Sequence, residues 1–174
     1  MPNLIRLEEA MAKNEVDPHW FLPFTIHRLR PLASNRVAVI ELTLQNIVHE
    51  ELTIRQLHFT WSPMSEARRV PPVQDHIITE WAACGMACAL VPLVTNFRVL
   101  QVTQMGDSFD YWIGDEQQEF GLEISGTLTN ELETRHRSKI RQLLSNKRRV
   151  AGFVSVTSFG NGRSIFSFHV QKGG

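Results

Sequence analysis

The sequence predicts an α/β fold in which a mixed central sheet is flanked by helices, with a β-rich N-terminal extension. Segments rich in β-branched residues occur in both halves of the chain, and in the second half a basic helical segment lies between two of them. A helix bracketed by strands fits a mixed sheet with helices packed on it better than a sandwich. With 174 residues, 43% of them hydrophobic, the chain is expected to form a single domain, residues 1–174, with a sizeable core.

The first 72 residues are expected to form a short helix followed by a β-meander. Leucine and isoleucine recur at helical spacing from Asn3 to Glu15, and the Asp17-Pro18 pair stops that pattern. Three segments rich in β-branched residues follow, and each predicts a strand: residues 24–30, 36–48 and 51–61. A proline-rich loop closes this portion before residue 73, and it is too short to be an interdomain linker.

Residues 73–170 alternate between helical and strand patterns. Residues 73–90 predict a helix of about five turns that Pro92 ends. Its expected apolar face consists of Ile77, Ile78, Trp81, Cys84, Ala87 and Cys88. The patterns that follow predict strands at 97–103, 108–113 and 119–128, a helix at 131–144, and strands at 152–159 and 164–170.

The cysteines and the N-terminus indicate the class of protein. Cys84 and Cys88 are the two cysteines, and their position in an apolar helix predicts core packing rather than a disulfide or a metal site. The N-terminus lacks the apolar region of a signal peptide, and no apolar run reaches the roughly 18 residues of a spanning helix. We therefore expect a cytoplasmic protein with no membrane partner.

Charge is segregated along the chain although the formal net charge is zero. Residues 107–123 contain six acidic residues and no basic one, whereas residues 135–149 contain seven basic residues and no acidic one. Any binding of nucleic acid therefore depends on this local basic segment rather than on overall charge. The expected phosphate contacts are Arg135, Arg137, Arg141 and Arg148.

Two acidic motifs lie on neighbouring predicted strands, GDSFD at residues 106–110 and LEIS at residues 122–125. With the order helix, three strands, helix, strand, these motifs resemble the core of the PD-(D/E)XK, or restriction-endonuclease-like, nuclease superfamily. The resemblance covers residues 73–170 and implies that Asp110 and Glu123 bind a metal ion. It also implies a lysine at position 125, where this chain has Ser125, a departure from the family pattern. Some members carry the lysine on the following helix, and Lys139, with Arg135 as the second choice, is the corresponding residue here.

The chemistry of the two acids supports a metal site independently. Side chains alternate along a strand, so Glu123 and Ser125 share a face, and a turn centred on residues 115–117 sets Asp110 nearly opposite Glu123. Two adjacent carboxylates repel unless a cation or proton lies between them. Mg²⁺, or Mn²⁺, suits such oxygen ligands and would serve phosphodiester hydrolysis.

A further acid lies on the first predicted helix. Glu80 falls at the edge of the apolar stripe, where a carboxylate is unfavourable without a partner, and His76 is near enough in sequence to be that partner. In the superfamily an acid from this helix often joins the metal site. Glu80 is therefore a third candidate ligand.

Two functions remain open at this stage. The first is metal-dependent hydrolysis of DNA or RNA, with Asp110, Glu123 and Glu80 as ligands and Lys139 positioning the water or a phosphate. The second is a noncatalytic member of the same fold that acts as an interaction or nucleic-acid-binding subunit, a reading that Ser125 and the neutral charge favour. A separate structural alternative for the two acids is that Asp110 caps or ends its strand in solvent, while Glu123 lies on an exposed sheet face and pairs with an arginine of the next helix. The resemblance further implies a homodimer or a protein partner.

Overall fold

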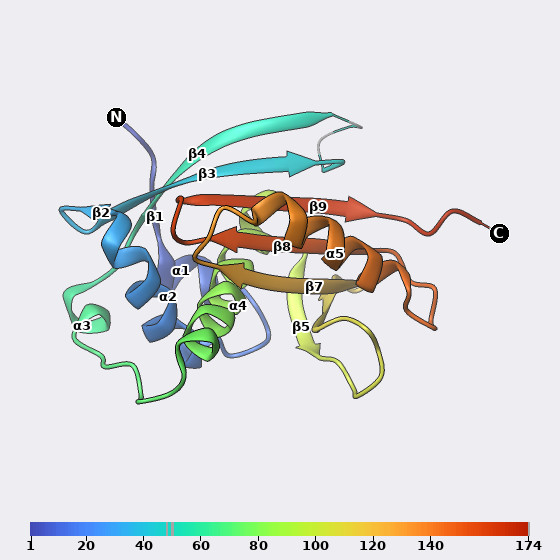
Figure 1. Ribbon diagram of the computed structural model, residues 1–174, viewed down its shortest axis with the longest axis horizontal. Helices are drawn as coiled ribbons and strands as arrows, with labels where there is room; N and C mark the ends of the chain where they lie inside the picture. Colours follow the sequence, from blue (N-terminus) through green and yellow to red (C-terminus); the bar gives the residue numbers. More distant parts are fainter. Residues whose placement is uncertain (48, 50, 174) are drawn as a thin grey trace.

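The computed structural model describes residues 1–47, 49 and 51–173, and these form one mixed sheet of nine strands flanked by helices (Figure 1). The strands are β1 (Leu4–Arg6), β2 (Ala33–Ser34), β3 (Val37–Gln45), β4 (Leu52–Thr60), β5 (Arg98–Val102), β6 (Tyr111–Gly114), β7 (Glu119–Thr127), β8 (Gly152–Ser158) and β9 (Arg163–His169). The helices are α1 (Leu7–Met11), α2 (Leu22–Leu29), α3 (Pro63–Glu66), α4 (Asp75–Val94) and α5 (Leu132–Leu144), with short 3-10 turns at Pro18–Trp20 and Arg30–Leu32. The predicted mixed sheet with flanking helices is confirmed.

The sheet joins the two halves of the chain. Its order is β1-β4-β3-β9-β8-β7-β6-β5, with β2 paired to the end of β3. β7 runs parallel to β8, because α5 crosses over between them, and β3 runs parallel to β9. The pairs β3–β4, β5–β6, β6–β7 and β8–β9 are antiparallel. Residues before position 73 thus extend the sheet that the later residues build.

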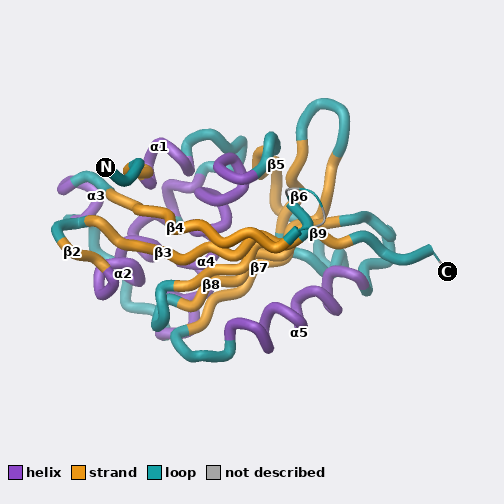
Figure 2. The backbone as a smooth tube through the Cα atoms, turned by 90° about the horizontal axis from the view of Figure 1, so that it is seen from above, coloured by secondary structure: helices purple, strands orange, loops and turns teal. Residues whose placement is uncertain are grey.

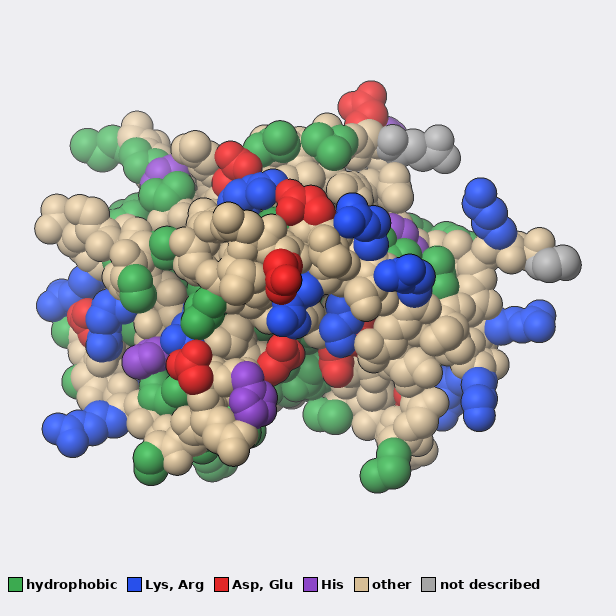
Figure 3. Space-filling view, in the orientation of Figure 1, with side chains coloured by type: hydrophobic (Ala, Val, Ile, Leu, Met, Phe, Trp, Pro, Cys, Tyr) green, Lys and Arg blue, Asp and Glu red, His purple; other side chains and the backbone are tan. Residues whose placement is uncertain are grey.

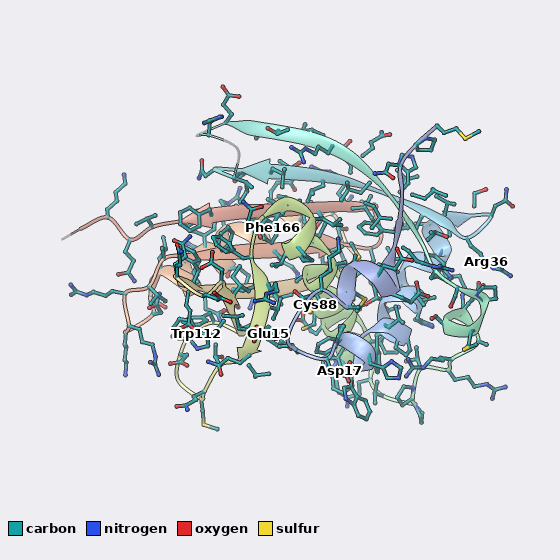
Figure 4. The ribbon with its side chains drawn as sticks, turned by 180° about the vertical axis from the view of Figure 1, so that it is seen from behind. Glu15, Asp17, Arg36, Cys88, Trp112 and Phe166 are labelled. Atoms are coloured by element: carbon teal, nitrogen blue, oxygen red, sulfur yellow. The ribbon has the colours of Figure 1, made fainter. Side chains whose placement is uncertain are left out.

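The two long helices cover opposite faces of the sheet (Figure 2). Gly126 of β7 faces α4, where an added Cβ would lie 2.7 Å from the carbonyl oxygen of Thr79. Gly121 of β7 faces α5, where an added Cβ would lie 3.2 Å from Cδ1 of Leu143. The even-numbered residues of β7 therefore point to α4 and the odd-numbered ones to α5, as strand alternation requires. Figure 4 shows Cys88 of α4 and Phe166 of β9, which both belong to the core on the α4 side.

Pro92 does not end α4, contrary to the prediction, since the helix runs on to Val94. A proline inside a helix cannot donate a hydrogen bond to the carbonyl four residues earlier, which here is that of Cys88. The side-chain amide of Asn14 donates to this carbonyl instead, at 2.6 Å. Asn14 also accepts a hydrogen bond from the backbone of Val99, so it joins α4 to β5.

α4 is buried on more sides than the predicted apolar stripe. It packs against α1, α2 and β7, and its buried residues include Ala82, Ala83 and Met86, whereas Trp81 of the predicted face is 41% exposed. Contrary to the prediction, α4 is long and apolar enough for a membrane span, because an 18-residue window of it has a mean hydropathy of 1.8. In this fold 56% of that window is buried inside the protein. Cys88 is buried and Cys84 half-buried, both as free thiols, which confirms the predicted core packing. Burial raises the pKa of the Cys88 thiol to about 12.

The N-terminal elements differ most from the prediction. Residues 24–29 fall in α2 and Arg30 begins the following 3-10 turn, rather than forming a strand. Leu22, Ile26 and Leu29 recur at helical spacing and are all buried. The predicted helix over residues 3–15 is divided into β1 and α1. The meander is therefore a two-stranded hairpin, β3–β4. The proline-rich loop contains α3, whose N-cap is Ser62.

Candidate active site

β6 and β7 are neighbours in the sheet, as the sequence predicts, and they separate at Asp110. The last paired residues are Tyr111 and Leu122, and Asp110 N–H still donates to the carbonyl of Leu122 at 2.9 Å. Beyond this point β7 has no backbone partner on this side among the described residues, and the Asp110 side chain takes the place of one. Its Oδ2 atom accepts a hydrogen bond from the N–H of Ile124 at 2.8 Å. Extending the register by one residue sets Asp110 opposite Glu123, as predicted. Asp110 is half-buried and does not end its strand in solvent.

Glu123 lies on the face of β7 that α5 covers, and its side chain is 0% exposed. Its Oε1 atom accepts a hydrogen bond from Nζ of Lys139 at 2.5 Å. Its Oε2 atom is buried and has no hydrogen-bond partner among the residues that the structure describes. Glu123 thus pairs with the predicted lysine of α5, rather than lying on an exposed face beside an arginine. An orphaned carboxylate oxygen in the interior is unfavourable unless a further donor or a cation meets it.

Glu80 approaches the same edge of β7 from α4. It is half-buried, and its pKa is raised by burial, an effect that Lys139 and the backbone N–H of Gly126 partly oppose. His76, the predicted partner of Glu80, is exposed and has no resolved contact with it among the described side chains. The outer edge of β7 is therefore lined by Asp110 at Ile124 and by Glu80 at Gly126.

Burial and neighbouring charges shift the pKa values of the three carboxyl groups. Burial raises the pKa of Asp110 and of Glu80, and the two charges also oppose one another. Burial, followed by the charge of Asp110, raises the pKa of Glu123 to about 7, although Lys139 acts in the opposite direction. The ammonium group of Lys139 acts against this rise in the pKa of all three acids. The charges of Lys139 and, at Glu80, of Arg135 therefore only partly offset the effect of burial, and all three pKa values stay raised.

The donor set suits a hard divalent cation. Carboxylate oxygens are the ligands that Mg²⁺ and Mn²⁺ prefer, and Mg²⁺ ordinarily keeps several waters and uses one or two protein carboxylates. Within residues 1–47, 49 and 51–173, no three acidic, histidine or cysteine side chains lie close enough to bind one ion together. The fit therefore rests on Asp110 and the free Oε2 of Glu123 as direct ligands, with Glu80 farther along the same edge.

Arg135 occupies the space above Ser125. Its Nη1 atom donates to Oγ of Ser125 at 3.4 Å, and its Nε atom is buried with no hydrogen-bond partner in the described part of the chain. Ser125 itself is 1% exposed. The nuclease superfamily that the sequence resembles has a lysine at this position. Here the position is a serine that lies beneath an arginine of α5, next to the Lys139–Glu123 pair.

The other predicted basic residues differ in how far they are free to bind phosphate. Arg137 and Arg141 are exposed on α5. Arg148 forms an ion pair with Asp107 at 2.7 Å and lies 5.7 Å above the ring of Trp112, so it is engaged within the protein. Figure 3 shows lysine and arginine side chains over α5 and the loop after it, interspersed with acidic ones.

Sequence reasoning did not single out a buried polar cluster beneath α5. Nε2 of His136 and Nε2 of His169 each lie 2.7 Å from Oγ of Ser167. Burial lowers the pKa of both imidazoles, that of His136 to about 4. The signal was present in the spacing, because His136 falls between Leu132 and Ile140 on the apolar stripe of α5.

Comparisons with protein-family models, with curated proteins and with solved structures gave no match to this chain.

Proposed function

We propose that the protein hydrolyses phosphodiester bonds in DNA or RNA with Mg²⁺ or Mn²⁺, using a restriction-endonuclease-like core. The observation that carries this proposal is the meeting of Asp110, Glu123 and Lys139 at the separation of β6 and β7. Burying carboxylates that repel one another lowers stability, so a site that keeps them together favours a role for their charge.

The order of elements supports the same core. The superfamily that the sequence resembles has the same order of elements as this chain, which is α4, β5, β6, β7, α5 and β8. In addition, β7 and β8 are parallel. Residues 1–72 would then be an extension that widens the sheet beyond β9. We also propose a cytoplasmic location, because the most apolar helix is used in the core.

Each side chain has a role in this proposal. Asp110 and Glu123 would hold the metal ion, with Glu80 orienting a water ligand along the same edge. An ion held by these residues would supply a lowered pKa for its water and stabilisation of the charge that develops on the phosphate. Lys139, already hydrogen-bonded to Glu123, positions the attacking water or a phosphate oxygen. Arg135, Arg137 and Arg141 lie on the same helix and are the candidate backbone contacts.

The test is cleavage of single- and double-stranded DNA and RNA with Mg²⁺ or Mn²⁺. Asp110→Asn keeps the acceptor for the Ile124 N–H, and Glu123→Gln keeps the side-chain shape, yet each should abolish cleavage because each removes a metal-binding charge. Lys139→Met should slow cleavage by a factor of about 10² to 10³. Glu116→Gln, in the exposed β6–β7 turn, is the matched control and should cleave normally.

A noncatalytic role in the same fold is the second candidate. The observation that favours it is the ion pair of Lys139 with Glu123, which offsets the charge of the acid without a metal, together with Ser125 in the lysine position. Absence of both cleavage and metal uptake by calorimetry, with wild-type protein, would leave this second function and exclude the first.

A further inference from the structure

β4 is an open edge of the sheet over most of its length. β1 pairs only with residues 58–60 of this strand, so among the described residues the outer side of residues 52–57 meets no other strand (Figure 1). Leu52 and Ile54 project from this segment and are 62% and 59% exposed. An edge strand presents unpaired N–H and C=O groups and readily accepts a further strand.

The opposite edge of the sheet, β5, is protected in ways that β4 is not. The register of β5 shifts between Val99 and Gln101. The carbonyl of Val99 accepts hydrogen bonds from the backbone of Glu15 and Val16, and its N–H donates to Asn14. Irregular pairing and a covering segment are the devices by which proteins prevent strand addition. Residues 52–57 contain no proline and one charged residue, Arg55, and they pair with β3 in regular register.

The sequence of this segment suits pairing with a second copy. When two identical strands pair antiparallel about a two-fold axis, opposite residues point to the same face of the sheet. The axis therefore lies between the two copies of one residue, which are opposite each other. An axis at Arg55 would set two guanidinium groups opposite one another, which is unfavourable. An axis at Ile54 sets the two Ile54 side chains together and places Arg55 opposite Thr53.

We propose that two copies of the chain associate by antiparallel pairing of residues 52–56, with the two-fold axis at Ile54. The pairing joins the two sheets into one and removes both Ile54 side chains from water. Because the paired segment is short, the interface falls in the small, weak class and the dimer forms reversibly with rising concentration. This association does not depend on the proposed hydrolysis.

Analytical ultracentrifugation over a range of concentrations tests the proposal. The wild-type protein should show a monomer–dimer equilibrium. Ile54→Lys should shift it to monomer, because a lysine on an edge strand opposes strand addition. Val39→Lys is the matched control, since Val39 is a 40% exposed valine on the same face but on the interior strand β3. It should dimerise as the wild type does, and circular dichroism should show that both variants are folded.

Cysteine cross-linking tests the register. Opposite side chains in an antiparallel pair have Cβ atoms about 4.5–5.5 Å apart, so Ile54→Cys should form a disulfide-linked dimer under mild oxidation. Thr53→Cys should not, because its opposite residue is Arg55. A wild-type protein that stays monomeric at all concentrations would overturn the proposal. So would a dimer that Ile54→Lys and Val39→Lys weaken equally, or one that cross-links at position 53 in preference to 54.

Discussion

Nζ of Lys139 lies 2.5 Å from Oε1 of Glu123, and this contact joins the middle of α5 to the middle of β7. The carboxylate is fully buried, whereas the lysine side chain is 25% exposed. A buried ion pair of this kind adds little net stability, because both charges lose their hydration. Its consequence is positional: it places an ammonium group beside an acid whose second oxygen is free.

Glu123 should make the metal-free protein less stable as the pH rises. Its pKa is raised to about 7 in the folded protein, so between the unfolded value of 4.5 and about 7 the folded state binds more protons than the unfolded one. The free energy of unfolding therefore falls over this window, by on the order of 3 kcal/mol from this group. Urea unfolding at pH 5 and pH 8 measures the fall. Glu123→Gln should remove much of it, and Glu116→Gln should not; equal falls in the two variants would contradict the assignment.

His136 should act in the opposite direction. Its pKa is lowered to about 4 in the folded protein, so as the pH falls from 6.5 to about 4 the unfolded state binds the additional proton. Stability is present above pH 6.5 and is lost below it, by on the order of 3 kcal/mol. His136→Gln keeps a polar group near Ser167 and should reduce this acid-induced loss relative to the wild type. His76→Gln, at an exposed histidine of α4, should leave it unchanged.

The later elements were predictable because local pattern and tertiary contact agree there. α5 begins and ends within one residue of its predicted range, and β7 matches its own closely. α2 was predicted as a strand because Thr25 and Ile26 are β-branched, yet burial follows the helical spacing of Leu22, Ile26 and Leu29. The extension of α4 past Pro92 depends on a hydrogen bond from Asn14, 74 residues before Cys88 in the chain, which no local pattern contains.

The site was predictable in its residue types but not in its exact pairings. The alternation of β7 and the spacing of α5 bring Lys139 to Glu123, as expected. Arg148, a predicted phosphate contact, pairs within the protein with Asp107, 41 residues away in sequence. Arg135, the second choice for the lysine role, lies against Ser125. Which of several long basic side chains reaches a given acid depends on the helix position, and residue spacing alone does not fix it.

Reversing the exposed charges of α5 should weaken the salt dependence of nucleic-acid binding. Each lost phosphate contact lowers the slope of log K against log salt by about 0.7 to 0.9, so Arg137→Glu with Arg141→Glu should lower it by about 1.4 to 1.8. Fluorescence anisotropy titrations at several salt concentrations give the slope. Arg6→Glu with Arg69→Glu makes the same change of charge away from α5 and is the control. Identical slopes in the two double variants would assign the α5 arginines to solubility.

If the protein has the proposed nuclease activity, Ser125→Lys should not increase it. Ser125 is 1% exposed and lies 3.4 Å from Nη1 of Arg135, so a new ammonium group would be buried against a like charge. An uncompensated buried charge costs on the order of 3 kcal/mol or more, which thermal unfolding would detect as a large loss of stability. Ser125→Ala, which removes the hydroxyl without adding charge, should cost about 1 kcal/mol.

The double variant Ser125→Lys/Arg135→Ala tests whether Arg135 is the reason that a lysine at position 125 is unfavourable, or whether the position requires serine for another reason. If the charge of Arg135 excludes the lysine, removing it should recover part of the stability and let the new ammonium reach Glu123. Cleavage should then depend less on Lys139, because two lysines would share its role. The combination of full stability and faster cleavage in the single Ser125→Lys variant would show that the space above Ser125 is open, and that Lys139 does not serve as the lysine of the site.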